Sequence, residues 1–583
     1  MMFIKKCIIS SILLSFCFFT GVNAQIKKQV PKPVNFADIK VGGDLSVRAT
    51  RNFERLHDDI YKPENVFPLV VSPNSASWPG DYEGRIIMGL VLEGQALHSE
   101  PKYLQQMIDL IPSKVNSKGY LGPIMKDSVM EQQLSGHGWF LRALCEYYTW
   151  KKDPKVKGYI QNIIQNLVIP TTGAHRVYPI RPEERLKAVG GMSGSTQNTI
   201  GKWMLSSDIG CDFIFMDGVI QAYELCPSKK LKAVVDEMVN RFLEMDLVKI
   251  QAQTHASLTA TRGLLRYYAI TGSPRLLQQA KARYDLYRKV AMTENFENFN
   301  WFDRPEWTEP CAIVDSYMVA TQLWEYTQDP SYLEDAQHIY YNALGHAQRA
   351  NGGFGCDNCP GPHADILKVH ADEAYWCCTM RGGEGLAKAI SYSYFLAPGA
   401  IYVSNFNSSL VSLKTTSGNL TLQQESGYPF DGVVKLNVVK SGVKKPIAIK
   451  FFSPSWTANP KLTINQHPVA FKKDKGFLTI SYIPKDGDKI VLTFDQKAEA
   501  KSMINEKYNH PELYSFYYGP LLLGYEGNDI PATAKNDQVV KISDSEFILK
   551  GKSVRLSPVC HLLNANVSSG SGYQKRILFK ESR

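Results

Sequence analysis

Apolar side chains recur at helical spacing from about residue 80 to residue 395. In "YLEDAQHIYYNALGHAQR", residues 332–349, they form one stripe along a helix. A second pattern repeats: a helix ends in aromatic residues, a short polar turn with proline follows, and another helix begins, as in "EYYTWKKDPKV" and "RYYAITGSPRLL". Proline suits the first turn of a helix because its missing N–H would have no partner there. The segment is therefore predicted to fold as a series of helical hairpins.

Helical hairpins can bury their apolar faces in an open superhelix or in a closed α/α barrel. The spacing of the hairpins is irregular and the loops between them are long. These features favour the closed barrel, in which one ring of helices surrounds another and leaves a pocket at one end.

The pattern changes at "FLAPGAIYVSNF", residues 395–406. The stretches that follow, such as "VVKLNVV", "PIAIKFF" and "DKIVLTF", are short, β-branched and alternating, and turns rich in Gly, Pro, Asp and Lys separate them. This alternation predicts an antiparallel β-sandwich. We expect a helical domain over residues 25–395 and one or more β-sandwich domains over residues 396–583.

The first residues, "MMFIKKCIISSILLSFCFFTGVNAQ", have the pattern of a secretory signal peptide. Two lysines precede an apolar run, and "VNA" precedes the expected cleavage after Ala24. No later apolar run is long enough to span a bilayer. The sequence thus predicts a signal peptide at residues 1–24 and a periplasmic or secreted protein without an integral membrane segment.

The formal charge of +10 does not indicate a nucleic-acid partner, because Lys and Arg are scattered along the chain. No basic helix and no interleaving of basic and aromatic residues is present. The nine Trp, 26 Phe and 30 Tyr suit a carbohydrate-binding surface as well as a packed core. Composition leaves the oligomeric state open.

Cysteines are concentrated in one part of the chain. Nine of the eleven remain after the signal peptide, and five of these lie between residues 311 and 378. Such clustering is more typical of a metal or reactive site than of dispersed disulfides. Glu309, Cys311, Cys377 and Cys378 are of the types that zinc accepts as ligands. Each of them taken singly could instead be a core residue or a helix-end carboxylate.

Two of these motifs, "EPCAIVDSYM" and "WCC", resemble glycoside hydrolase family 127, the β-L-arabinofuranosidases and their relatives. The stretches "GDYEGR", "QQLSGHGWFLRALCEYY" and "THASLTATRGLLRYY" extend the resemblance across the helical domain. The resemblance implies an (α/α)6-barrel catalytic domain followed by a C-terminal antiparallel β-sandwich. It also implies a Zn²⁺ cofactor held by Glu309, Cys311, Cys377 and Cys378.

The resemblance further implies a retaining exo-glycoside hydrolase that acts on oligo- or polysaccharides of plant cell walls. Cys377 would be the nucleophile. Glu294 would be the acid/base, although Glu297 has a similar context and the family's preceding glycine is absent. β-L-Arabinofuranose or a related furanose is the implied product, formed through an S-glycosyl enzyme.

The chain departs from the family after the paired cysteines, where "TMRGGEG" stands in place of Pro-Pro-Asn. An additional pair, Cys356 and Cys359, allows two rival interpretations. One is a structural zinc held by these two with Cys377 and Cys378, without catalysis. The other is a disulfide between Cys356 and Cys359, or a reserve pair of ligands.

Further residues are candidates for contacts with the sugar. His137 and His255 match positions where relatives keep sugar-contacting histidines, and each could equally be a packed or capping residue. Trp301, with its neighbour Trp307, could stack on a sugar face. Arg381 could pair with a substrate carboxylate or could satisfy a helix end.

Two other classes of function remain open at this point. The first is another α/α-barrel carbohydrate enzyme, such as a uronyl hydrolase or a lyase, which needs no cysteine. The second is a non-catalytic glycan-binding protein with a structural zinc. Zinc removal or thiol alkylation should abolish activity only in the enzyme of the family 127 type.

Overall fold

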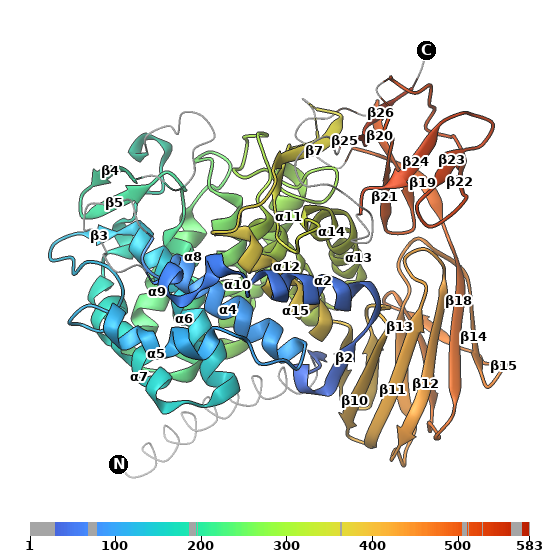
Figure 1. Ribbon diagram of the computed structural model, residues 1–583, viewed down its shortest axis with the longest axis horizontal. Helices are drawn as coiled ribbons and strands as arrows, with labels where there is room; N and C mark the ends of the chain where they lie inside the picture. The colour runs from blue at the N-terminus through green and yellow to red at the C-terminus, as the bar shows by residue number, and fades with distance from the viewer. Residues whose placement is uncertain are drawn as a thin grey trace, which may run out of the picture.

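A computed structural model describes residues 30–67, 78–185, 194, 196–361, 364–503, 510, 512–527, 529–560 and 574–581. The predicted signal peptide lies outside these residues. Figure 1 shows a helical body followed by β-structure toward the C-terminus. No helix among the described residues has the length and apolarity that a membrane crossing requires.

The helical body is a closed double ring. Within the described residues, six helices contact one another in sequence, and the last packs against the first. They are α4 (Asp81–Ala96), α6 (Glu131–Lys151), α8 (Asp212–Leu225), α10 (Thr254–Thr271), α12 (Pro310–Thr327) and α15 (Cys378–Ser391). The contact between α15 and α4 excludes the open superhelix and confirms the predicted α/α barrel.

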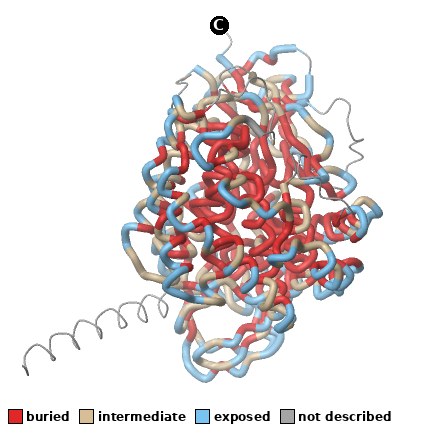
Figure 2. Tube along the Cα trace, turned by 90° about the vertical axis from the view of Figure 1, so that its left-hand side faces the viewer, coloured by how far each residue is buried: buried red, intermediate tan, exposed pale blue. Residues whose placement is uncertain are grey.

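A second layer of helices covers this ring. Its members are α2 (Gly43–Arg55), α5 (Leu104–Lys114), α7 (Pro154–Ile163), α9 (Lys229–Glu244), α11 (Pro274–Val290) and α13 (Pro330–His338). The two layers differ in sequence, because inner helices are apolar or buried nearly all round whereas outer helices bury one stripe. In α9 that stripe includes Leu231, Val235 and Met238. Figure 2 shows the buried segments gathered inside a layer of exposed turns.

Five sheets are present among the described residues, and three of them make up most of the β-structure. The first has the strand order β1 (Lys32–Pro33), β8 (Tyr394–Ala397), β9 (Ala400–Val403), β13 (Ile447–Phe452), β17 (Phe477–Tyr482) and β16 (Lys472–Asp474). The second has the order β15 (His467–Pro468), β14 (Thr457–Ile464), β18 (Lys489–Gln496), β12 (Val433–Ser441), β11 (Gly418–Ser426), β10 (Ser409–Thr415) and β2 (Ile39–Val41). The third has the order β19 (Ala498–Ser502), β20 (Leu513–Tyr518), β21 (Leu521–Gly524), β24 (Arg555–Pro558), β23 (Phe547–Leu549) and β22 (Val539–Lys541), with β26 (Phe579–Lys580) beside β20. Strands such as β10 (Ser409–Thr415) alternate buried and exposed residues, as the sequence pattern predicts. The C-terminal region is thus β-rich and mainly antiparallel, with β9 (Ala400–Val403) and β13 (Ile447–Phe452) as a parallel pair.

The domain borders differ from a simple division at residue 395. β8 (Tyr394–Ala397) contains that position, and α15 ends just before it at Ser391. Near the N-terminus, β1 (Lys32–Pro33) pairs with β8, and β2 (Ile39–Val41) pairs with β10. The chain therefore begins in the β-structure and then enters the barrel. The sequence missed these strands because two or three residues carry no readable periodicity.

Candidate active site and metal centre

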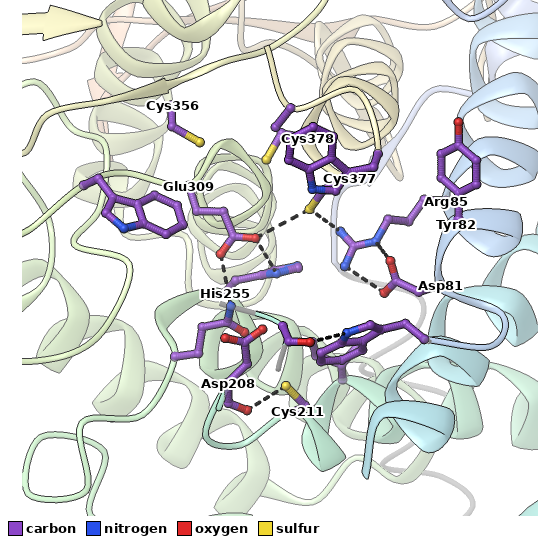
Figure 3. A pocket seen from close by; sticks show the side chains of 17 residues that line it. Asp81, Tyr82, Arg85, Asp208, Cys211, His255, Glu309, Cys356, Cys377 and Cys378 are labelled. Carbon is purple, nitrogen blue, oxygen red and sulfur yellow. Dashed lines mark hydrogen bonds and ion pairs between the residues drawn. The ribbon is translucent and has the colours of Figure 1, made fainter. Parts of the chain in front are cut away.

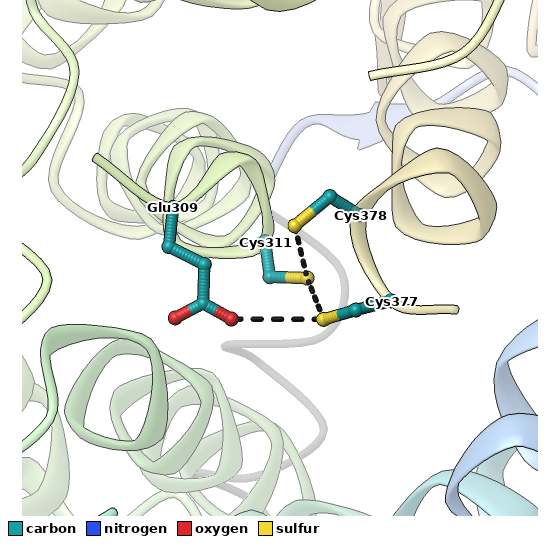
Figure 4. A group of neighbouring side chains, drawn as sticks. All are labelled: Glu309, Cys311, Cys377 and Cys378. Atoms are coloured by element: carbon teal, nitrogen blue, oxygen red, sulfur yellow. Dashed lines mark hydrogen bonds between the residues drawn. The ribbon is translucent and has the colours of Figure 1, made fainter. Parts of the chain in front are cut away.

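The four predicted metal ligands come together where two inner helices begin. Glu309 is the N-cap residue of α12 and Cys311 lies in its first turn, while Cys377 caps α15 and Cys378 is its first residue. Figure 4 shows the three sulfurs and the Glu309 carboxylate facing one another. The positive ends of both helix dipoles point toward these groups, which favours their anionic forms.

The spacing of the ligand atoms suits a metal ion. The Cys311 sulfur lies 3.2 Å from that of Cys377 and 3.6 Å from that of Cys378, and Cys377 Sγ lies 3.7 Å from Glu309 Oε1. The four ligand atoms all lie within 4.8 Å of one another. Sulfurs bound to one tetrahedral zinc would be about 3.8 Å apart. The set therefore fits a single ion after shifts of a few tenths of an ångström.

Arg85, on α4, supplies a positive charge to the sulfur cluster. Its guanidinium donates hydrogen bonds to Cys311 Sγ at 3.2 Å and to Cys377 Sγ at 3.3 Å. Asp81 accepts two further hydrogen bonds from Arg85, at 2.7 and 3.0 Å, and so fixes its orientation. Hydrogen bonds from Cys311 and Cys378, together with the Arg85 charge, hold the pKa of Cys377 well below its usual range, against the effect of burial. Cys377 is thus the sulfur best prepared to act as a thiolate.

Glu309 is oriented by residues of the neighbouring α10 segment. Gln253 Nε2 donates to Glu309 Oε2 at 3.3 Å, and His255 Nδ1 lies 3.3 Å from Glu309 Oε1. The other ring nitrogen of His255 lies 3.4 Å from Asp315. Both nitrogens of His255 therefore lie near carboxylates, and His255 lines the cavity beside Glu309.

A cavity of about 430 Å³ opens over the sulfur cluster. This volume lies within the range typical of small-ligand sites. Figure 3 shows Cys377, Glu309, Arg85 and Asp208 around it. Its lining combines aromatic and ionisable groups and includes Trp78, Asp81, Tyr82, Arg85, Asp208, Gln253, His255, Trp307, Glu309, Cys356, Trp376, Cys377 and Cys378.

Three of the four predicted sugar-contacting residues do not line this cavity. His137 is fully buried, its Nδ1 donates to the Gln133 carbonyl at 2.8 Å, and its Nε2 accepts the Leu121 N–H at 3.1 Å. Burial lowers the pKa of His137 to about 4, so it is a neutral structural residue. The prediction that His137 binds substrate is not supported, because both ring nitrogens are occupied.

Trp301 and Arg381 are buried behind the site. Trp301 packs edge-on against Trp307, with ring centroids 5.5 Å apart, and it is Trp307 that reaches the cavity. Arg381 donates to Asp315 at 2.6 Å and also pairs with Glu384. Arg381 therefore belongs to a buried ion-pair network beneath His255 and is not placed to bind a substrate carboxylate.

Neither candidate acid/base from the resemblance lies among the described residues that line the cavity. Glu294 is 1% exposed, and with burial its charge raises the pKa of Tyr517, on β20 (Leu513–Tyr518). Glu297 lies 3.4 Å from His346, in a buried group with Asp357. The carboxyl groups that do line the cavity belong to Asp81, Asp208 and Glu309.

The two rival uses of Cys356 and Cys359 receive no support. All nine cysteines after residue 24 are described, and all are free thiols, so these two form no disulfide. Cys359 donates to the Asn298 carbonyl at 3.7 Å and is not part of the clustered ligand set. Cys356 lines the cavity and remains a neighbour of Cys378.

The departure "TMRGGEG" has a packing explanation. A Cβ at Gly382 would lie 2.1 Å from the Phe354 ring, and one at Gly383 would lie 2.9 Å from the Glu93 carboxylate. Contacts this short leave no room for a side chain. Glycines thus let α15 approach its neighbours closely, which brings Cys377 and Cys378 to the Glu309 side of the barrel.

Comparison with protein families finds a match in the β-structure. Residues 400–496 match the family model described as "Beta-L-arabinofuranosidase, GH127 middle domain". This part of the chain is therefore similar to the middle domain of glycoside hydrolase family 127. The predicted resemblance to this family is thereby confirmed. The matched residues lie in the β-structure, so the site residues in the barrel rest on the geometry given above.

Solved GH127 structures share the whole fold. A structure described as a GH127 β-arabinofuranosidase superposes with a TM-score of 0.68 at 13% identity, over 95% of this chain and 98% of its own. A GH127 β-L-arabinofuranosidase from Geobacillus stearothermophilus T6 gives 0.67 at 13% identity, over 93% and 100%. At this identity the likeness concerns the fold. No curated protein matches the chain by sequence.

Proposed function

We propose that the protein is a retaining glycoside hydrolase of the GH127 kind, with Cys377 as its nucleophile. The observation that carries the proposal is the position of the Cys377 sulfur, which lines an open cavity and lies beside three further potential ligands. A structural metal site would not need an accessible thiolate next to a ligand-sized cavity. The GH127 middle domain and the shared fold support the same activity.

We further propose that the metal is zinc, held by Glu309, Cys311, Cys377 and Cys378. Three thiolates and one carboxylate form a donor set that zinc accepts in four-coordinate sites. When bound, zinc would keep the sulfurs deprotonated and resistant to oxidation. Such protection matters in the periplasmic or secreted location that residues 1–24 predict.

In the proposed reaction, the Cys377 sulfur attacks the anomeric carbon while the glycosidic C–O bond breaks. A carboxylic acid donates its proton to the departing oxygen, and the product is an S-glycosyl enzyme. The resulting carboxylate then accepts a proton from water as the water oxygen attacks the same carbon and the C–S bond breaks. Two displacements at one carbon give net retention of configuration.

Two residues compete for the proton-transfer role. The resemblance assigns it to Glu294, which is buried beside the third sheet. The cavity itself offers Asp208, which lies in the turn before α8 and lines the same cavity as Cys377. A group that protonates the leaving oxygen must come within hydrogen-bond reach of it. On this criterion we favour Asp208.

The proposed substrate is a plant cell-wall glycan that ends in β-L-arabinofuranose or a related furanose. The sugar follows from the family description and from the relatives, not from the cavity alone. A screen of aryl and methyl furanosides with purified protein tests it, with mass spectrometry of the acid-quenched enzyme as a second readout. A sugar adduct on the peptide that contains Cys377 is expected, and turnover without any adduct would contradict the proposal.

A matched variant makes the assignment specific. Cys356 lines the same cavity and lies outside the ligand set. Cys356→Ser should therefore keep turnover and the adduct, whereas Cys377→Ser should lose both.

A further inference from the structure

The mouth of the cavity is marked by an exposed tryptophan next to the proposed nucleophile. All nine tryptophans lie in the described part of the chain, and Trp376 alone falls among its exposed large hydrophobic residues, at 57%. A single exposed aromatic residue needs no special explanation. Trp376, however, also lines the cavity and directly precedes Cys377.

The turn that carries Trp376 is held firmly. The Ala374 carbonyl accepts hydrogen bonds from the N–H groups of Cys377 and Cys378, at 3.2 and 2.9 Å. The Tyr61 hydroxyl donates to the Tyr375 carbonyl at 2.7 Å, and the Tyr375 ring meets the Trp376 ring edge to face, with centroids 4.7 Å apart. The exposed indole therefore sits on a fixed support, which lowers the entropy cost of binding a ligand against it.

Two further tryptophans line the same cavity. Trp78 donates its indole N–H to the Gly194 carbonyl at 3.1 Å, and Trp307 stacks on His370 with an interplanar angle of 4°. Both are partly buried, whereas Trp376 is exposed. The sugar that reacts must contact the Cys377 sulfur. Trp376 is the more exposed lining residue, so it is placed beside the leaving group to which that sugar is linked.

The charges of the cavity restrict what that group can be. Arg85 is the one guanidinium or ammonium group among the described residues of the lining, and it is engaged by Asp81 and two sulfurs. Asp81, Asp208 and Glu309 contribute carboxyl groups. A divalent ion with three thiolates and one carboxylate would leave the centre net negative. An anionic ligand group would therefore be repelled.

We propose that Trp376 forms a binding subsite for a neutral sugar residue on the leaving-group side of the scissile bond. The sugar stacks its apolar face on the exposed indole, and uronic acids are disfavoured there. This inference rests on the proposed function. It extends that function from the sugar that is attacked by Cys377 to the sugar that forms the leaving group.

The test compares leaving groups in wild-type and Trp376→Ala proteins. Three substrates carry the same β-L-arabinofuranosyl group on methanol, on neutral L-arabinose and on galacturonic acid. In the wild type, kcat/KM should be highest for the arabinose compound. In Trp376→Ala, the ratio of kcat/KM for the arabinose compound to that for the methyl compound should fall about tenfold, the size of one aromatic contact.

Trp150→Ala is the control, because Trp150 is a partly exposed tryptophan at the end of α6 that lines a different cavity. An unchanged ratio in Trp376→Ala would overturn the subsite, and so would a wild-type preference for the galacturonic acid compound.

Absence of turnover on all three substrates would instead count against the proposed function. Calorimetric titration with a neutral arabino-oligosaccharide would then decide the subsite, since equal affinities of wild type and Trp376→Ala would overturn it.

Discussion

The protein contains two buried clusters with the residue types of a metal site, and they differ in what surrounds them. The first is the sulfur cluster of Glu309, Cys311, Cys377 and Cys378, and the second comprises Glu297, His346 and Asp357. The first opens to a cavity, and Cys377 is partly exposed. All three members of the second are fully buried.

The second cluster already balances its own charges. His346 Nδ1 lies 2.9 Å from Asp357 and 3.4 Å from Glu297, and Arg349 donates to Asp357 at 2.9 Å. A cation would have to displace these partners, and all three side chains are buried. Ligand types alone therefore do not define a functional site. Accessibility and unbalanced charge distinguish the sulfur cluster from a structural ion-pair group.

The largest effect is expected from replacing the proposed nucleophile, Cys377, in the sulfur cluster. Cys377→Ser should lose turnover by on the order of 10⁴-fold or more, because a serine hydroxyl is neither ionised nor soft. Steady-state kinetics on the best aryl furanoside measures the loss, and proton NMR of the first-formed product should show retention in the wild type. Near-normal activity in Cys377→Ser, or an inverted product, would contradict the mechanism.

Substitutions of carboxylates that line the cavity and of carboxylates that do not should differ in their effect on turnover. Asp208→Asn should lower turnover on alkyl glycosides by roughly 10²- to 10⁴-fold, and less on aryl glycosides with acidic leaving groups, because those depart without a proton. Glu294→Gln and Glu297→Gln should lack this dependence on the leaving group. If the dependence appears in Glu294→Gln instead, the assignment from the resemblance is correct and Asp208 is not the acid/base.

Metal content tests the two clusters directly. Protein purified without chelators should contain about one zinc per chain, as a single tetrahedral site implies. Cys311→Ala should lose that zinc, whereas His346→Gln should retain it. Elemental analysis of both variants measures the zinc content. Loss of zinc only in His346→Gln would show that the second cluster binds the metal.

The second cluster should instead affect stability. Asp357→Asn leaves the charges of Arg349 and His346 without their shared partner, which should cost about 3–5 kcal/mol in the free energy of unfolding. Chemical denaturation of the zinc-loaded protein measures this cost. The matched change is Asp208→Asn, which should alter the stability much less.

The smallest expected effect is a pH dependence confined to the second cluster. Although burial opposes it, Asp357 and Glu297 raise the pKa of His346 to about 9. Because the folded pKa lies above the ordinary value of 6.5, this stabilisation is complete below pH 6.5 and disappears as the pH rises through 9. Denaturation curves between pH 6.5 and 10 should show a larger loss of stability in wild type than in His346→Gln.

Sequence and structure agree where the information is local. The helical stripes, the aromatic–turn–proline pattern and the alternating strands predict the barrel and the β-sandwich, since burial imposes these periods on the chain. The spacing Glu309-Pro-Cys311 works in the same way, because a helix N-terminus places both side chains on one side. Residue types and the clustering of cysteines placed Cys377 and Cys378 in the same candidate ligand set, and the resemblance implied the role of each.

Individual roles were harder to predict, because they depend on which neighbours a fold brings near. His137 and Arg381 stand on inner helices, yet their partners come from Leu121, Gln133, Asp315 and Glu384. Arg85 and Asp81 lay inside the recognised "GDYEGR", but nothing in that motif indicates that Arg85 meets sulfurs more than two hundred residues away.

The sequence by itself determined the two fold classes, the pairing of a Glu-x-Cys with a Cys-Cys motif, and the resemblance to glycoside hydrolase family 127. Only the tertiary structure decided that β1 and β2 pair with strands of the C-terminal β-structure, that Glu294 is buried and is not among the residues that line the cavity, and that Trp376 is an exposed lining residue. The physical reason is that periodicity records whether a residue is buried. The identity of its neighbours and its access to solvent are set by contacts between segments that are distant in the chain.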